Sequence, residues 1–310
     1  MPISAAHSSV VAAHPVRCGC GAPLRLLQDG GSHGGGNLLY VCERPERPLL
    51  LKVYRRRGGR GGEWFKDQSH RLFEGKRGVT ARARFETELA SMALWTEKGF
   101  DTFRRCEHAL PAPNLTPSMW VEFCAGRSLA DIYEDEATSF DEKALLTQRM
   151  AADVARRQQL AFTLDEPLLV QEHASIKHLF ITGERRIWFD LENAYGPRYR
   201  VIEALAQELS GLLRSMARKA EAQFEPLLHA FVRGYTQREL LREIATYGVH
   251  HAGVYRRIKR WYDRRNRASF AKTTVLELLL EAVATETRAG ADISPARTES
   301  AQPTPLRGLR

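Results

Sequence analysis

The chain has 310 residues and a formal net charge of +9, from 46 Lys and Arg against 37 Asp and Glu. Hydrophobic residues make up 43% and charged residues 27% of the sequence, ordinary values for a folded protein that exclude a wholly disordered or collagen-like chain. The positive charge is concentrated in two segments. Residues 51–84 hold eleven Lys or Arg against three Asp or Glu, and residues 251–272 hold eight against one. Such segments attract phosphates, nucleic acid or anionic lipid, and composition alone does not choose among them.

The cysteines and histidines give no sign of a metal site at the level of sequence spacing. The five cysteines are scattered, and Cys18-Gly-Cys20 has no second matching pair nearby, which argues against a zinc knuckle. His108 and the other dispersed histidines also lack ligand spacing. We therefore expect a reduced, cytoplasmic chain.

Two further patterns bear on the location of the protein. Residues 1–17 lack the cationic and apolar regions of a secretory signal. The longest apolar run, residues 275–284, is interrupted by Glu277 and Glu281, so it predicts an amphipathic helix and no bilayer-spanning segment.

The predicted elements of the first half are strands with one helix among them. The helix covers residues 81–98 and stops at Gly99, with Phe85, Leu89 and Met92 expected on its buried stripe. Short runs rich in Leu, Val and Tyr, bounded by Gly or Pro, predict strands at residues 23–28, 37–42, 48–54 and 118–123.

The second half is predicted to be mainly helical, with one hairpin at residues 178–190 around the turn Gly183-Glu184. Helices are expected at residues 141–159, 199–219, 225–235, 238–247, 254–267 and 272–287. The chain then divides into a tail at 1–17, a sheet lobe at 18–124, a helical lobe at 125–287 and a tail at 288–310. This is an α+β, two-lobed architecture.

One lysine and one glutamate stand at apolar positions. Lys52 lies in the middle of the strand Leu49-Leu-Leu-Lys-Val-Tyr54, and a buried lysine is costly unless it meets an anion. Glu88 falls on the apolar face of the predicted helix, whereas Glu86 lies off it. Lys52 and Glu88 can therefore satisfy each other, although an edge strand with an exposed lysine remains an alternative.

Asp190 follows the second hairpin strand, in Trp188-Phe-Asp-Leu-Glu-Asn193. A carboxylate just past a buried strand is placed to hold Mg²⁺ beside phosphates, or simply to cap a turn. His178 begins the first hairpin strand and His173 lies five residues before it. Strand lysine, helix glutamate, and a loop feeding a hairpin that ends in Asp is the order used by protein-kinase-like enzymes.

These stretches resemble the protein-kinase-like fold, and most closely the bacterial lipopolysaccharide core kinases that phosphorylate heptose or Kdo sugars. The matching stretches are Leu51-Lys-Val-Tyr54, the helix after Phe85, Trp120-Val-Glu-Phe-Cys124, Ser175-Ile-Lys-His178 and Trp188-Phe-Asp190. The resemblance implies a bilobal protein-kinase-like fold with a small antiparallel-sheet N-lobe, a mainly helical C-lobe, and ATP and Mg²⁺ as cofactors.

The resemblance also implies a role for each matching residue. Lys52 would hold the α- and β-phosphates and Glu88 would orient Lys52. Asp190 would chelate Mg²⁺, with His178 at the position where protein kinases have the metal-binding asparagine. The hinge backbone at Glu122, Phe123 and Cys124 would meet adenine. The glycine-rich segment Gly30–Gly36 is as well explained by a flexible hairpin loop as by a phosphate contact. For Gly58–Gly62 a mobile loop between strand and helix is favoured over a contact with the substrate phosphate.

The catalytic loop departs from the family pattern, because His173 stands where the proton-accepting aspartate is expected. A neutral imidazole accepts a proton near pH 7, so His173 can serve as the general base. Glu172 is an alternative base. The third alternative is that the proton acceptor has been lost and the chain is a pseudokinase.

The basic segment 254–267 has three interpretations: a surface helix with solvated arginines, a helix lying on anionic lipid at the inner face of the cell membrane, or a nucleic-acid contact. The resemblance favours anionic glycolipid over nucleic acid. The sequence thus predicts an ATP- and Mg²⁺-dependent kinase acting on a sugar or glycolipid hydroxyl. The alternatives are a pseudokinase that binds a nucleotide or a partner, and a Ser/Thr protein kinase.

Overall fold

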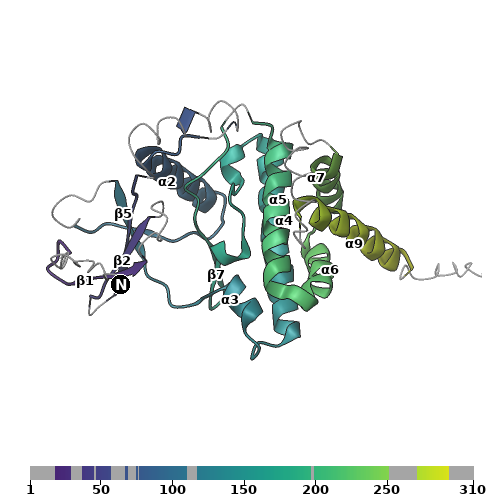
Figure 1. Ribbon diagram of the computed structural model, residues 1–310, viewed down its shortest axis with the longest axis horizontal. Helices are drawn as coiled ribbons and strands as arrows, with labels where there is room; N and C mark the ends of the chain where they lie inside the picture. The colour runs from purple at the N-terminus through teal and green to yellow at the C-terminus, as the bar shows by residue number, and fades with distance from the viewer. Residues whose placement is uncertain are drawn as a thin grey trace, which may run out of the picture.

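The computed structural model describes residues 18–28, 37–44, 47–56, 67–68, 75, 77–109, 117–196, 199–250 and 271–292. A sheet lies on one side of the molecule and a group of helices on the other (Figure 1). Four segments singled out in the sequence lie outside the described residues: the 1–17 tail, the glycine-rich segments 30–36 and 58–62, and the basic segment 254–267.

The first lobe is a five-stranded antiparallel sheet in the order β1-β2-β3-β5-β4. Its strands are β1 (Leu24–Gln28), β2 (Leu38–Cys42), β3 (Leu49–Val53), β4 (Arg105–Cys106) and β5 (Ser118–Glu122). Alternation along β3 sends Leu49, Leu51 and Val53 to one face, where they pack with Trp120. Lys52 therefore points to the opposite face, where it meets a helix.

That helix is α2 (Ala81–Glu97), which begins at Thr80, whose hydroxyl accepts a hydrogen bond from the backbone N–H of Ala83 at 3.2 Å. It ends at Gly99, whose φ of +78° suits glycine. Its buried residues include Met92, as expected, but Phe85 and Leu89 are only partly buried. The helix instead buries a stripe with polar members, because Arg84 and Glu88 find partners beneath it.

A second, three-stranded sheet in the order β6-β7-β8 stands at the start of the helical lobe. The predicted hairpin is present as β7 (Leu179–Thr182) and β8 (Arg185–Trp188), and the turn between them contains Gly183 at φ +56°. The two-residue strands β4 and β6 (Arg127–Ser128) were not predicted, because two residues carry no periodicity.

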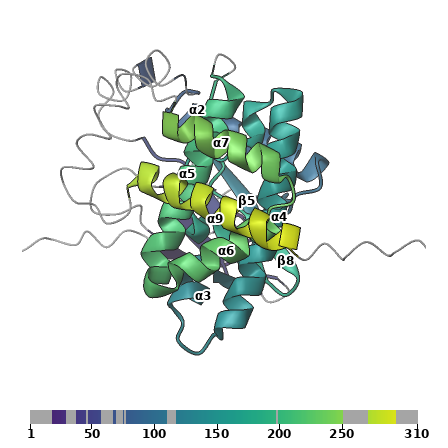
Figure 2. The same ribbon diagram turned by 90° about the vertical axis from the view of Figure 1, so that its right-hand side faces the viewer.

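The second lobe is built from long helices. In the described part they are α3 (Leu129–Glu134), α4 (Phe140–Leu164), α5 (Val201–Ala220), α6 (Phe224–Gly234), α7 (Arg238–His250) and α9 (Lys272–Asp292). α9 lies across α5, α6 and α7 (Figure 2) and continues past Arg288, where the sequence predicted a tail. None of the helices in the described ranges is both long and apolar enough to cross a membrane.

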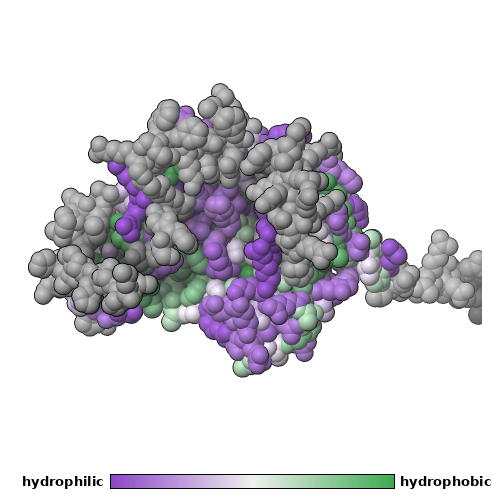
Figure 3. All heavy atoms as spheres, in the orientation of Figure 1, coloured by the Kyte–Doolittle hydropathy of each residue, from purple (hydrophilic) through white to green (hydrophobic). Residues whose placement is uncertain are grey.

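Side chains from both lobes join one hydrophobic core that runs from Tyr54 and Trp95 through α4 and α5 to Val283. In Figure 3 the surface around α3 is mainly hydrophilic, because charged residues are exposed there. An antiparallel-sheet lobe with one helix, followed by a mostly helical lobe, is a kinase-like bilobal α+β fold. The predicted fold class is confirmed.

Candidate active site between the two lobes

A cavity of about 530 Å³ lies between the sheet lobe and the helical lobe. Eight residues to which the sequence assigned a site role line this cavity: Lys52, Glu88, Glu122, Phe123, Cys124, His173, His178 and Asp190. Glu172, the alternative base, is not among its lining residues. Apolar side chains from β1, β2, β3 and β5 form its walls on one side, and Phe180 and Leu191 lie on the other. A cavity of this size with apolar walls and a few convergent polar groups is typical of small-ligand sites.

Lys52 and Glu88 form a buried ion pair. Lys52 Nζ lies 2.6 Å from Glu88 Oε2, and the Tyr54 hydroxyl donates to the same oxygen at 2.5 Å. Burial alone would lower the pKa of Lys52, but the carboxylates of Glu88, Glu192 and Asp190 outweigh it and raise that pKa. Lys52 is therefore a permanent cation at the cavity wall. Glu86, the competing glutamate, lies on the exposed side and pairs with Arg82.

A second carboxylate, Glu192, reaches Lys52, and the sequence analysis gave it no role. Glu192 Oε2 lies 3.4 Å from Lys52 Nζ, and Glu192 Oε1 lies 3.0 Å from Arg84 Nη1. Asn37, just before β2, donates to Glu192 and accepts from Arg84 at 2.7 Å. Two buried cations thus face two buried carboxylates.

The positions of Arg84 and Glu192 in the sequence are close to residues that the sequence had already identified. Arg84 lies one helical turn before Glu88, and Glu192 lies two residues after Asp190, so each stands next to a residue already selected. The resulting network ties α2, β2, β3 and the segment after β8 together beneath the cavity.

Asp190 has the left-handed backbone φ of +64°, which Asp tolerates better than most residues. Its Oδ2 lies 3.1 Å from His178 Nε2, while His178 Nδ1 lies 2.9 Å from the carbonyl oxygen of His173 and donates to it. Burial lowers the pKa of His178 although Asp190 opposes this, so the neutral imidazole is favoured. In the neutral form the lone pair of His178 Nε2 faces a lone pair of Asp190 Oδ2. A cation bound between these two atoms would remove the repulsion.

The donor set here is one carboxylate and one imidazole. The carboxylate of Asp190 fits Mg²⁺, which prefers oxygen ligands. The nitrogen of His178 fits Mg²⁺ less well, so phosphate oxygens and water would have to complete the coordination.

His173 stands at the mouth of the cavity with its side chain 55% exposed. Its Nε2 lies 2.9 Å from Oε2 of Glu172, whose side chain is only 5% exposed. Glu172 would therefore form an ion pair with His173 once the imidazole takes up a proton. A carboxylate beside an imidazole stabilises the imidazolium that proton acceptance creates.

The expected hinge follows β5. The side chain of Glu122 is buried and accepts from Arg185 Nη2 at 2.9 Å and from the Arg104 backbone N–H at 3.0 Å. Burial alone would raise the pKa of Glu122, but these hydrogen bonds lower it. The backbone N–H of Glu122 also donates, to the Arg104 carbonyl at 2.9 Å. The carboxylate and the backbone N–H of Glu122 are thus already bonded to the segment before β4 and to β8. Phe123 and Cys124 are therefore better placed than Glu122 to contact a ligand.

The loop that carries His173 is anchored by a buried ion pair. Arg157 Nη1 lies 2.6 Å from Glu208 Oε1 and 2.6 Å from the carbonyl oxygen of Leu169. The backbone N–H of Gln171 donates to the same carboxylate oxygen at 2.6 Å, and Gln158 Nε2 donates to its Oε2 at 2.7 Å. The guanidinium of Arg157 also lies 4.3 Å from the Trp95 ring, on α2.

Comparison with known proteins adds little to this description. No protein-family model matches the chain, and no curated protein matches it. The solved structures that it resembles include the crystal structure of the maize SIRK1 (sucrose-induced receptor kinase 1) kinase domain bound to AMP-PNP. That match has 15% sequence identity and a TM-score of 0.35, and it covers 90% of each chain. The kinase-like fold follows from the strand order and the helices described above.

Proposed function

We propose that this protein is a phosphotransferase that binds ATP and Mg²⁺ in the cavity between its lobes and transfers the γ-phosphate to a hydroxyl of a lipopolysaccharide core sugar or a related acceptor. One observation carries the proposal. A single cavity of about 530 Å³ is lined by Lys52, Glu88, His173 and Asp190, which come from four different segments of the chain. Phosphoryl transfer depends on positioned cations and a positioned acceptor for the hydroxyl proton, and this set provides both.

In this proposal Lys52 contacts the α- and β-phosphates. An ammonium group has three donors. Glu88 takes one and Glu192 is the second partner, so one remains for a phosphate oxygen on the cavity side. The adenine would lie between the apolar walls, against the backbone of Phe123 and Cys124.

Asp190 would hold Mg²⁺, with His178 beside it, and bound Mg²⁺ would neutralise charge on the phosphates during transfer. His173 Nδ1 would take the proton of the attacking hydroxyl while Glu172 stabilises the imidazolium that forms. Because His173 is exposed at the cavity mouth, its position suits an acceptor that arrives from solvent.

The acceptor class is supported by the resemblance of five sequence stretches to the lipopolysaccharide core kinases. The ATP requirement and that acceptor favour a cytoplasmic protein that works at the inner face of the membrane. A purified-protein assay with γ-labelled ATP, Mg²⁺ and lipopolysaccharide core oligosaccharide tests the proposal. Transfer of label to the oligosaccharide supports it. Label on a generic Ser/Thr peptide alone replaces it with the protein-kinase alternative.

A second candidate, a pseudokinase, is favoured by one observation: the residue at the catalytic position is a half-exposed histidine and not an aspartate. ATP-dependent thermal stabilisation of the wild-type protein without transfer to any acceptor would support this candidate and contradict the first.

Replacement of His173 distinguishes the phosphotransferase most clearly from the pseudokinase. We expect His173→Gln to lower kcat by about 100-fold or more, the usual contribution of a general base. The KM for ATP should stay the same, because His173 lies at the mouth and not on the nucleotide walls. His229→Gln, on α6 and paired with Glu286, is the matched control and should leave kcat unchanged. An unchanged kcat in His173→Gln would contradict the role given to this residue.

A further inference from the structure

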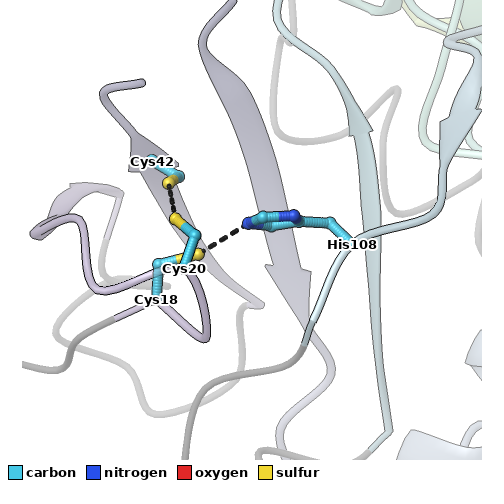
Figure 4. A group of neighbouring side chains, drawn as sticks. All are labelled: Cys18, Cys20, Cys42 and His108. Atoms are coloured by element: carbon cyan, nitrogen blue, oxygen red, sulfur yellow. Dashed lines mark hydrogen bonds between the residues drawn. The ribbon is translucent and has the colours of Figure 1, made fainter. Parts of the chain in front are cut away.

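Three of the five cysteines and one histidine, which the sequence spacing had treated as unrelated, lie together in the sheet lobe. Cys18 and Cys20 flank a tight turn in which the Gly21 N–H donates to the Cys18 carbonyl at 2.8 Å. Cys42 is the last residue of β2, and His108 follows β4. The four side chains converge in Figure 4, and their ligand atoms all lie within 4.8 Å of one another. The sequence spacing gave no sign of this group, because its four members come from three separate segments of the chain.

The distances within the group suit a tetrahedral metal ion. The Sγ atoms of Cys20 and Cys42 lie 3.7 Å apart, and Cys18 Sγ lies 2.8 Å from His108 Nε2. In a tetrahedral zinc site with bonds of about 2.3 Å to sulfur and about 2.0 Å to nitrogen, neighbouring ligand atoms are roughly 3.5–3.8 Å apart. Shifts of about 1 Å or less in the side chains therefore complete the geometry.

We propose that Cys18, Cys20, Cys42 and His108 bind one zinc ion as a structural Cys₃His site. Three sulfur ligands and one imidazole select zinc over Mg²⁺ or Ca²⁺, which prefer oxygen. Four protein ligands fill a tetrahedron and leave no position for a substrate, which is the mark of a structural site.

The location of the group explains what a metal would do there. Cys18 and Cys42 pack with Leu49, Leu51 and Trp120 on the face of the sheet opposite to Lys52. His108 contacts the Trp120 ring edge-on at 4.9 Å between centroids. The apolar cluster on this face is small, so the sheet there has little buried surface to hold it together. A metal would join the turn before β1, the end of β2 and the segment after β4, and it would stabilise the lobe without contacting the nucleotide cavity.

A disulfide between Cys20 and Cys42 is the main alternative. All five cysteines are free, and a disulfide requires the two sulfur atoms to close from 3.7 Å to about 2.05 Å. It would also leave Cys18 and His108 paired with each other for no evident purpose. A single metal ion accounts for the convergence of all four side chains.

The proposal is tested on the full chain, purified without chelator and dialysed against metal-free buffer. Elemental analysis should find one zinc per chain, and replacement by Co²⁺ should give the visible absorption of a tetrahedral cobalt–thiolate site. Cys20→Ser is the first variant because Cys20 is exposed, and the loss of one thiol there should not prevent folding. We expect its zinc content to fall to near zero at the same dialysis.

Cys106→Ser is the matched control, since Cys106 lies in β4 two residues before His108 but outside the group. It should retain one zinc. A chelator should lower the melting temperature of the wild type and of Cys106→Ser, and should not change that of Cys20→Ser. Wild-type protein without zinc and without cobalt absorption, or a Cys20–Cys42 disulfide in the non-reduced peptide map, would overturn the proposal. None of these results depends on ATP binding or phosphoryl transfer.

Discussion

Replacing Lys52 with methionine should abolish the stabilisation of the protein by ATP. Wild-type protein at an ATP concentration 100-fold above the dissociation constant should gain about 2.7 kcal/mol of stability, and Lys52→Met should gain almost none at the same concentration. The reason is that Lys52 is a buried cation at the cavity wall with one donor left for phosphate beyond Glu88 and Glu192, and methionine has nearly the same length without charge or donor. Thermal unfolding with and without ATP and Mg²⁺ measures the difference.

The ATP-induced change, and not the absolute melting temperature, is the quantity to compare. Lys52→Met leaves the buried carboxylates of Glu88 and Glu192 without the ammonium group that faces both of them, so the nucleotide-free protein should also become less stable. Lys98→Met is the control, because Lys98 lies at the end of α2 in a surface pair with Glu97. Full ATP-dependent stabilisation in Lys52→Met would mean that the nucleotide binds outside the cavity lined by Lys52.

Replacing Glu208 with glutamine should destabilise the protein by about 3–5 kcal/mol, because Arg157 would keep its charge in the core without a counter-charge. The side chains of Arg157 and Glu208 are 1% and 0% exposed, so water cannot take the place of the lost carboxylate. The amide nitrogen of glutamine would also face one of the donors that Glu208 now accepts from. The urea concentration at the midpoint of unfolding measures the loss.

Two comparisons separate this effect from a general sensitivity to charge removal. Glu239→Gln breaks a surface pair with Arg242 and should change the unfolding free energy by less than about 0.5 kcal/mol. The double replacement Arg157→Met with Glu208→Leu removes both charges and should recover part of the stability. The recovery should be incomplete, because the Gln171 N–H and the Leu169 carbonyl lose their partners. A loss below about 1 kcal/mol in Glu208→Gln would show that this network does not hold the loop that carries His173.

The sequence predicted the elements with a clear period and the charged residues that stand at apolar positions. The hairpin of β7 and β8 follows from alternation and a glycine turn. The pairing of Lys52 with Glu88 follows from two polar residues that each needed a partner. The hairpin could be predicted because its pattern lies within one short stretch of chain. The ion pair could be predicted because two short stretches each place one charge of opposite sign at an apolar position.

What the sequence did not predict depends on contacts between distant segments. Glu192 and Arg84 are separated by 108 positions, and nothing in either local sequence identifies the other as its partner. Cys18 and His108 are separated by 90 positions and flank β1 and β4, the opposite edge strands of the sheet, yet they meet beside Trp120 on one face of it. Such contacts arise from the tertiary arrangement, which local periodicity does not encode.

The central claim is that the cavity between the lobes binds the nucleotide, with adenine beside Phe123 and Cys124. Photolabelling with an azido-adenine analogue of ATP, followed by peptide mapping, tests it most directly. We predict label on peptides from the cavity wall, those containing residues 122–124, Leu27 or Leu39, and we predict that excess ATP removes it. ATP-sensitive label confined to peptides of α6, α7 or α9, or the absence of any ATP-sensitive label, would contradict the claim.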